Sequence, residues 1–139
     1  MPEFSIFRQS GVIPFRISKN GLQVLMITSS SGQRWVFPKG IIEPDLTPQE
    51  SAAAEALEEA GAEGDVLPLS LGTYMRKKWG GTAKVELFPM SVTKVLDNWP
   101  EKYLRRREWL SIEDARSRIS DIAVIEMLRL LEKYIRSQA

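Results

Sequence analysis

The sequence contains no cysteine and no histidine. Because cysteine is absent, neither a disulfide framework nor a thiolate metal site can form, and a reducing compartment is compatible with the chain. The absence of histidine excludes imidazole-based zinc sites and catalysis by a serine–histidine pair. Any acid–base chemistry must therefore come from carboxylates, lysine or tyrosine.

Long apolar runs are also missing. Nowhere do about 18 apolar residues follow one another, and the opening stretch MPEFSIFRQSG has no basic segment followed by a long apolar one. We therefore expect no membrane-spanning segment and a cytoplasmic location. The 139 residues, of which 43% are hydrophobic, suffice for one core and are too few for two ordinary domains. A single domain over residues 1–139 is predicted.

An excess of charge of either sign is also lacking, since the formal net charge is +1. This balance argues against a general nucleic-acid-binding or membrane-coating role. The charges are nevertheless segregated along the chain. Residues 40–75 include eight acidic side chains and no lysine or arginine, whereas basic clusters occupy residues 76–78 and 102–107.

Two hairpins are predicted from the pattern of apolar and β-branched residues. Residues 11–18 and 22–30 form the first, because an Asn-Gly pair separates them, and Pro14 indicates an edge position or a bulge. The second spans residues 69–95 and turns at Gly80-Gly81. A further short strand is expected in RWVFPKG, and another in REWLS.

One strong helix is predicted between the hairpins. Thr47 is its expected N-cap, Pro48 its first residue, and Glu50 completes a capping box, while Gly61 ends the helix. Two more helices are expected at about residues 111–119 and 121–135, the latter with an apolar stripe. This mixture of hairpins and helices predicts an α/β (α+β) fold in which helices cover a mixed sheet.

The strong helix carries an acidic cluster. At 100° per residue, Glu55, Glu58 and Glu59 fall within an arc of roughly 100°. The opposite side is expected to pack, and it consists of Ala53, Leu57 and Ala60. Like charges three or four residues apart each cost on the order of 0.2–0.5 kcal/mol, and no basic residue of the helix relieves them. A hard divalent cation such as Mg²⁺ would do so, and a solvated helix face is the alternative interpretation.

The run GIIEPDLTPQESAAAEALEEAGA resembles the Nudix box, G-x5-E-x7-R-E-U-x-E-E-x-G-U, in which U is apolar. Five of the seven fixed positions match in register, namely Gly40, Glu55, Glu58, Glu59 and Gly61. The flanking RWVFPKG and EP are also similar to the family. The resemblance implies a Nudix-like fold, with a mixed sheet sandwiched between helices and the loop-helix motif at about residues 40–62.

Two positions depart from the family pattern. Leu46 stands where the family has its first glutamate, and Ala54 stands where it has an arginine. Because one acid and one base are missing together, we expect no unpaired buried charge to remain. Either charge restored alone is then expected to cost stability. Both departures bear on catalytic efficiency.

The resemblance also implies roles for the glutamates. Nudix proteins cleave a pyrophosphate linkage in a nucleoside diphosphate attached to another group, usually with Mg²⁺ or Mn²⁺. By this resemblance Glu55 and Glu59 hold the metal, and Glu58 activates water or adds a ligand. Glu86, on the later hairpin, is a further candidate ligand. The alternative for Glu86 is an outward-facing strand residue.

Several residues are candidates for substrate binding. Gly40 permits close approach of the loop backbone to phosphate, and guanidinium groups suit phosphate oxygens. Lys78, at the tip of the second hairpin, lies beside Trp79, which is either a stacking platform for a base or folded back on the sheet. The candidates are Arg34, Lys39, Gly40, Lys78, Arg105 and Arg107, with a solvated loop as the alternative for the last two.

Within the family, RWVFPKG together with LDNW and RREWLSIEDA is most similar to the branch that handles diadenosine polyphosphates and diphosphoinositol polyphosphates. We therefore predict a metal-dependent pyrophosphohydrolase acting on a small phosphorylated substrate. Two alternatives are a Nudix hydrolase acting on RNA 5′ ends or nucleotide sugars, and a non-catalytic phosphate-ligand sensor. Neither the exact substrate nor the oligomeric state follows from the sequence.

Overall fold

The computed structural model describes residues 6–138. Its centre is an eight-stranded mixed sheet in the order β3-β2-β1-β7-β5, with β4 paired to β1, β6 to β7 and β8 to β2. The strands are β1 (Ile6–Ser18), β2 (Gly21–Thr28), β3 (Trp35–Val36), β4 (Lys39–Ile41), β5 (Ala62–Val66), β6 (Gly72–Lys78), β7 (Gly81–Val95) and β8 (Arg107–Ser111).

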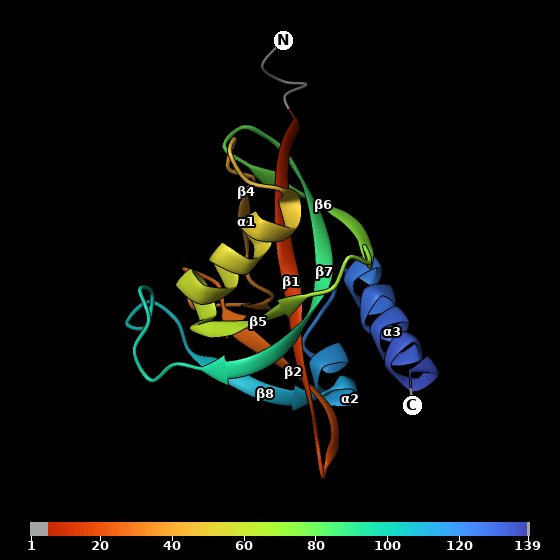
Figure 1. Ribbon diagram of the computed structural model, residues 1–139. Coiled ribbons are helices and arrows are strands. Elements are labelled where there is room, and N and C mark those ends of the chain that lie inside the picture. The colour runs from red at the N-terminus through yellow and green to blue at the C-terminus, as the bar shows by residue number, and fades with distance from the viewer. Residues whose placement is uncertain (1–5, 139) are drawn as a thin grey trace.

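Helices cover both faces of this sheet (Figure 1). One face carries α1 (Pro48–Glu55), which continues into the π-helical turn η2 (Ala56–Ala60). The other face carries α2 (Ile112–Ser117) and α3 (Ile122–Ser137). The predicted arrangement of a mixed sheet between helices is confirmed. The single-domain organisation of residues 1–139 stays a prediction.

Both predicted hairpins form. In the first, Phe15 pairs with Val24 and Ser18 with Gly21, whose φ of 99° requires glycine. In the second, Trp79 and Gly80 make the turn with φ values of 51° and 72°, one residue earlier than expected. A tight turn with two positive φ values matches the twist of the flanking strands.

The position of Pro14 differs from the expectation of an edge or a bulge. β1 lies inside the sheet, and Pro14 pairs in parallel register with Met90 of β7. On its other side β1 pairs with β4 only at residues 9–11 and with β2 only from Phe15 onward. The amide of Val12 donates to Pro38 on that side, so the nitrogen of Pro14 also points there, into the gap between the two ladders. No hydrogen bond is lost.

Strand β5 was absent from the expected elements. Its sequence, AEGDV, alternates between small or apolar and acidic residues but has Val66 as its one strong strand former, and its pairing with β7 shifts register between Glu63 and Gly64. A bulged edge strand with polar side chains has little sequence signal, because neighbouring strands rather than its own residues determine it.

Two cores lie on the two faces of the sheet. Val12 belongs to the core under α1, and Ile13 belongs to the core under α2 and α3, as the alternation along a strand requires. The α1 core includes Ala52, Ala56 and Ala60, whose small side chains bring the helix close to the sheet. Among residues 6–138, no helix is long and apolar enough to cross a membrane.

Candidate active site

The helix that carries the glutamates begins as predicted. The amide of Glu50 donates to Thr47 Oγ1 at 3.1 Å, and the amide of Thr47 donates to Glu50 Oε1 at 2.8 Å. This capping box satisfies two amides that the helix itself leaves without partners. Gly61 ends the helix with a φ of 63°.

The π-helical turn changes where the glutamates point. Its hydrogen bonds run over five residues instead of four, so the positions after Ala56 rotate relative to an α-helix. Glu59 is consequently buried, with 8% of its surface exposed, while Glu58 is exposed and Glu55 is half-buried. The expected acidic cluster forms, since the carboxylates of Glu59 and Glu58 both raise the pKa of Glu55, but the expectation that this face does not pack is wrong for Glu59. The expected packing side is also wrong in part, since Ala53 and Leu57 are only half-buried.

The carboxylate of Glu55 lies directly over Gly40 of β4. A Cβ atom added at Gly40 would occupy the place of this carboxylate, so the glycine provides the space. Burial is the main cause that raises the pKa of Glu55 to about 8, and the neighbouring carboxylates of Glu59 and Glu58 add to it. Glu101 and Glu43 contribute in the same direction. A nearby cation would therefore stabilise the ionised form of this carboxylate.

Glu59 meets two cationic residues inside the protein. Its Oε1 accepts from the amide of Lys39 at 3.2 Å, and its Oε2 lies 3.5 Å from Nη2 of Arg105. Burial raises the pKa of Glu59, and Arg105 and Lys39 offset part of that rise. The expectation that no basic residue relieves the acidic cluster is therefore incomplete, because both partners come from other parts of the chain.

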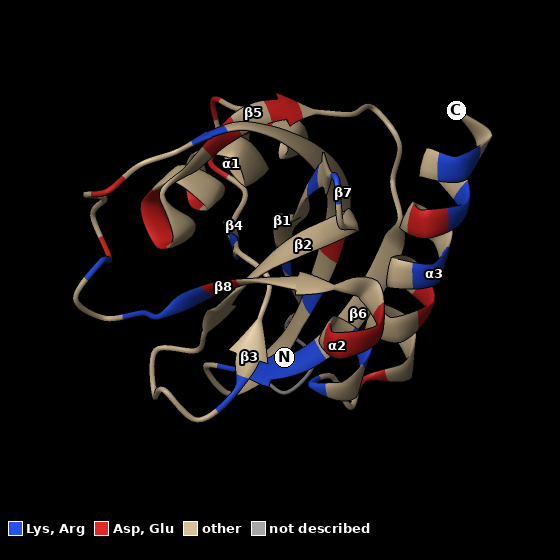
Figure 2. Ribbon diagram, turned by 90° about the horizontal axis from the view of Figure 1, so that it is seen from below, with Lys and Arg blue, Asp and Glu red and all other residues tan. Residues whose placement is uncertain are grey.

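Arg105 and Arg107 have protein partners instead of an open, solvated position. Arg105 Nε donates to Glu101 at 2.7 Å, and its Nη1 donates to the carbonyl of Thr28 at 2.8 Å. Arg107 donates to the carbonyls of Ala60 and Leu96. Figure 2 shows the acidic bands of α1 and η2 and the basic chain that leads into β8 on one side of the molecule. These contacts favour a positioning role for both arginines over substrate binding.

Glu86 lies on the same face of the sheet as Glu55. Gly40, Ser10 and Glu86 are side by side on β4, β1 and β7, and paired residues point to one face. Ser10 between them is fully buried, and its Oγ has no hydrogen-bond partner among the described residues. Glu86 is half-buried, so it is neither fully outward-facing nor in the core. Its role as a ligand stays a prediction.

Carboxylate oxygens are the donors that hard divalent cations prefer. In the part of the chain that the structure describes, no three acidic side chains already converge as a metal-binding group. The residues fit such an ion in two other respects: Gly40 lets the Glu55 carboxylate lie against β4, and Ser10, paired with Gly40, has a buried oxygen without a partner among the described residues.

A basic cavity of about 380 Å³ adjoins the glutamates on the other face of the sheet. Lys39 connects the two, because its amide donates to Glu59 while its side chain lines the cavity. Burial and the charge of Arg76 lower the pKa of Lys39 to about 8. The cationic residues of the lining are Arg34, Lys39, Arg76 and Arg118, and Trp35 and Tyr74 contribute aromatic surface.

Sequence reasoning identified Arg34 and Lys39 for this region and missed Tyr74, Arg76 and Arg118. Tyr74 and Arg76 are two residues apart on β6, so they share one face of the strand. This period of two, extended from the basic cluster at residues 76–78, is the sequence signal that could have identified both. Arg118 had no such signal, since it follows α2 and reaches the cavity only through the packing of that helix. Its guanidinium lies 4.7 Å from the ring centroid of Trp35, which is half-buried against the core.

Lys78 lies outside the basic cavity, at the hairpin tip. Its Nζ is 4.4 Å from the ring centroid of Trp79, and burial together with Arg76 lowers its pKa. Trp79 is 61% exposed and meets Phe7 edge to face at 5.5 Å. Because Phe7 belongs to β1, the tryptophan contacts the sheet through this ring, while most of its own surface stays exposed.

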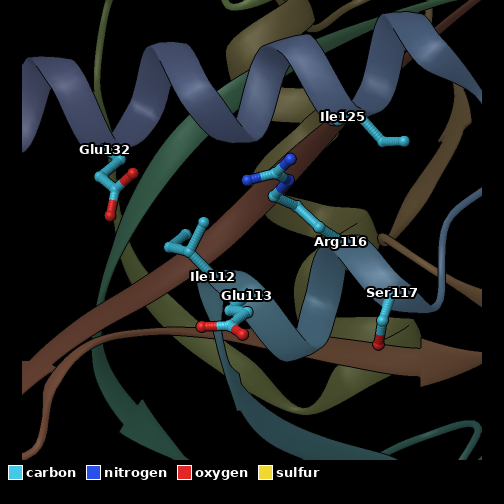
Figure 3. A pocket seen from close by; sticks show the side chains of 6 residues that line it. All are labelled: Ile112, Glu113, Arg116, Ser117, Ile125 and Glu132. Carbon is cyan, nitrogen blue, oxygen red and sulfur yellow. The ribbon is translucent and has the colours of Figure 1, made fainter.

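A cavity of about 580 Å³, larger than the basic cavity, lies between α2 and α3 (Figure 3). Arg116 and Glu132 point into it from the two helices, and no residue of the glutamate motif lines it. The smaller basic cavity, in contrast, is linked to the glutamates through Lys39.

Comparison with known proteins decides the family. The model described as NUDIX domain matches residues 7–131. This chain belongs to the Nudix family. Nudix hydrolase 12, mitochondrial, of Arabidopsis thaliana is 35% identical over 148 residues, covering 88% of this chain and 73% of that protein. Nudix hydrolase 16, mitochondrial, of the same plant is 41% identical over 124 residues, covering 76% and 68%.

The expected branch is also represented among the relatives. Diphosphoinositol polyphosphate phosphohydrolase 3-alpha of Mus musculus is 31% identical over 110 residues, covering 78% of this Nudix chain and 66% of that protein. The crystal structure of C. elegans Ap4A hydrolase has a TM-score of 0.77 at 17% identity, covering 94% and 99% of the two chains, and it supports the fold alone.

Family membership makes this Nudix protein an enzyme, a hydrolase of pyrophosphate bonds. Nudix hydrolases act on small phosphorylated substrates and generally use divalent cations. The predicted enzyme class is confirmed. Several relatives are named as mitochondrial, so the cytoplasmic location stays a prediction.

The two departures from the Nudix box lie at the surface. Leu46 is 37% exposed, and Ala54 is exposed on α1. The pair missing from this Nudix hydrolase would thus stand in water, where an unpaired charge costs little. The expectation that either charge restored alone destabilises the protein is therefore not supported.

Proposed function

We propose that this Nudix hydrolase requires Mg²⁺ or Mn²⁺ and that its substrates carry several phosphates, as dinucleoside polyphosphates and diphosphoinositol polyphosphates do. One observation carries the proposal: Lys39 joins the buried glutamate turn directly to a basic cavity. A substrate can then have its scissile bond at the glutamates and its remaining phosphates in the cavity.

The glutamates have different roles in the proposed hydrolysis. Glu55 and Glu59 would hold the cation, which supplies neutralisation of phosphate charge and a lower pKa of water when bound. Binding requires Glu59 to loosen its contacts with Lys39 and Arg105, and it relieves the raised pKa of Glu55. Glu58, exposed and adjacent, accepts the proton of the attacking water as general base. Glu86 is a further candidate ligand.

The basic cavity provides the preference for several phosphates. Arg34, Arg76 and Arg118 surround it, and guanidinium groups form paired hydrogen bonds with phosphate oxygens. Each further phosphate of the substrate adds charge that these groups attract. A nucleotide sugar, whose neutral sugar carries no such charge, would use the cavity less well.

Lys78 and Trp79 would distinguish the two preferred substrate classes. Trp79 is an exposed indole at the hairpin tip, beside a cavity of about 550 Å³ that Lys78 also lines. An indole face stacks on a nucleoside base, whereas an inositol ring has no π surface to offer. We therefore assign this tip to nucleoside recognition.

A substrate panel tests the proposed function. Dinucleoside polyphosphates, diphosphoinositol polyphosphates, nucleotide sugars and RNA with a 5′ triphosphate are incubated with Mg²⁺ or with EDTA, and the products are separated by anion-exchange chromatography. We expect hydrolysis only with Mg²⁺ and the highest kcat/KM for one of the first two classes. Highest kcat/KM for a nucleotide sugar would contradict the substrate assignment, and undiminished turnover in EDTA would contradict the metal requirement.

Trp79→Ala then separates the two classes. We expect a KM about tenfold higher for dinucleoside polyphosphates, in line with the loss of one stacked base, and an unchanged KM for diphosphoinositol polyphosphates. Tyr103→Ala is the matched control, because Tyr103 is also an exposed aromatic beside a lysine, with 92% of its surface exposed and Lys102 Nζ 5.9 Å from its ring. Equal effects of the two variants would remove Trp79 from the site.

A further inference from the structure

Four consecutive backbone carbonyls at the end of the glutamate helix are bound by one distant stretch of chain, residues 96–107. The carbonyl of Glu58 accepts from the amide of Glu101 at 3.1 Å, and the carbonyl of Gly61 accepts from the amide of Leu96 at 2.8 Å. The two carbonyls between them accept from side chains. Helix ends leave such carbonyls without partners, so this stretch completes the turn that carries Glu58 and Glu59.

Trp99 and Arg107 are the two side-chain donors, and we call them the clasp. Trp99 Nε1 donates to the carbonyl of Glu59 at 3.0 Å, and Arg107 Nη1 donates to the carbonyl of Ala60 at 2.8 Å. Arg107 Nη2 also donates to the carbonyl of Leu96 at 2.6 Å, which ties the clasp to its own chain. The guanidinium stacks 3.9 Å from the ring of Trp99, so the two donors hold each other in place.

Gly61 lets the clasp reach the helix end. A Cβ atom at this position would lie 2.8 Å from Arg107 Nη1 and 2.9 Å from two ring atoms of Trp99. The glycine therefore serves both the left-handed turn and the close approach of the clasp. The positive charge of Arg107 also complements the negative end of the helix dipole.

We propose that Trp99 and Arg107 are positioning residues for hydrolysis, because they hold the π-helical turn in the register that directs Glu59 inward and Glu58 outward. The residues whose carbonyls are bound include Glu58 and Glu59 themselves. Loss of a donor therefore lets the backbone of these two glutamates relax. An α-helical register would rotate Glu59 away from Lys39 and Arg105. The clasp thus acts on metal affinity and on turnover through the backbone, without touching the substrate.

This inference rests on the proposed metal site, so its test uses direct Mn²⁺ binding, measured by electron paramagnetic resonance, beside steady-state kinetics. Trp99→Phe keeps a ring under Arg107 and removes only the donor to Glu59. Arg107→Lys keeps the charge, replaces the two donor nitrogens by a single ammonium nitrogen and removes the planar group that stacks on Trp99. We expect each to weaken Mn²⁺ binding by about tenfold and to lower kcat by about tenfold, as loss of outer-shell support does, with KM at saturating metal within about twofold.

Trp109→Phe and Arg16→Lys are matched controls. Arg16 stacks on Trp109 at 4.1 Å from the ring centroid and donates to Gln23 instead of to a carbonyl of the glutamate turn, so the same substitutions test the general cost of losing a stack. The controls are expected to change the melting temperature while leaving Mn²⁺ binding and kcat at wild-type values.

If both clasp variants keep wild-type Mn²⁺ affinity and kcat and only melt earlier, the clasp is structural and the inference is wrong. Should Arg107→Lys not fold, Trp99→Phe alone decides between these outcomes. Absence of hydrolysis by wild type would count against the proposed function, and the clasp would still be judged by the Mn²⁺ affinity of its variants. Absence of Mn²⁺ binding by wild type would overturn both.

Discussion

Glu55 lies half-buried over Gly40 among the carboxylates of Glu59, Glu58, Glu101 and Glu43. Burial first, and these neighbours second, raise the pKa of Glu55 to about 8 from its ordinary value of 4.5. The folded protein therefore binds a proton more tightly than the unfolded chain does between those two pH values. Stability without metal must fall as the pH rises through this window.

We predict that, in EDTA, wild type loses melting temperature between pH 5 and pH 8, and that Glu55→Gln shows a smaller loss. The amide cannot ionise, so it removes the cost of placing a charge there. Thermal melts monitored by circular dichroism at several pH values measure the difference. Parallel curves for the two proteins would show that Glu55 ionises normally in the folded state.

Leu46 and Ala54 provide a second test at this scale, because they replace the charged pair of the Nudix box at exposed positions. We predict that Leu46→Glu and Ala54→Arg each change the free energy of unfolding by less than about 0.5 kcal/mol. The double variant should equal or exceed wild-type kcat. A double-mutant cycle on melting and turnover measures the coupling, and a coupling above about 1 kcal/mol would contradict the surface placement.

At the scale of elements, α1 and β4 meet at Gly40, where the helix side chain takes the space of a missing Cβ. We predict that Gly40→Ala displaces the Glu55 carboxylate and lowers kcat/KM by about 100-fold, since small misplacements of reacting groups have effects of that size. Ile41→Ala, on the same strand and 45% exposed, is the control and should retain activity. Equal kinetics of Gly40→Ala and wild type would argue that the carboxylate is not placed by this contact.

The same elements show which parts of the fold and of the site can be predicted from the sequence. The capping box, the two hairpins, the helices and the glutamate motif are local patterns of turn, cap and spacing residues, and they form where expected. The π-helical turn was not predictable, because donors from residues 96–107 complete it across more than 30 residues of chain. The burial of Glu59 was consequently not foreseen. Its salt bridge to Arg105 was missed for the same reason, since helix periodicity contains no tertiary contacts.

At the scale of the whole molecule, the sheet separates the glutamates from the cationic side chains of the basic cavity. Lys39 and Gly40 are consecutive on β4, so one faces the basic cavity and the other faces Glu55. A substrate must therefore pass the edge of the sheet at β4 to reach both. From the basic clusters at residues 76–78 and 102–107, Lys78, Arg105 and Arg107 were predicted to bind substrate, yet Arg76 is the residue of these clusters that lines this cavity.

We predict that Arg76→Ala raises KM for a substrate with several phosphates by about tenfold and weakens the dependence of KM on salt. Lys77→Ala is the matched control, because Lys77 alternates to the other face of β6. Steady-state kinetics over a roughly fifteen-fold range of salt, from about 20 to about 300 mM KCl, measure both effects. If Lys77→Ala had the larger effect on KM, the substrate would bind on the α1 face instead.

The central claim is that Glu58 accepts the proton of the attacking water in a metal-dependent hydrolysis at the glutamate turn. It is tested most directly by kcat of Glu58→Gln at saturating Mg²⁺ and saturating substrate, because the amide keeps the shape of the side chain and removes its basicity. We predict a kcat at least about 100-fold below wild type, with the melting temperature unchanged at this exposed position. A kcat equal to that of wild type would contradict the claim.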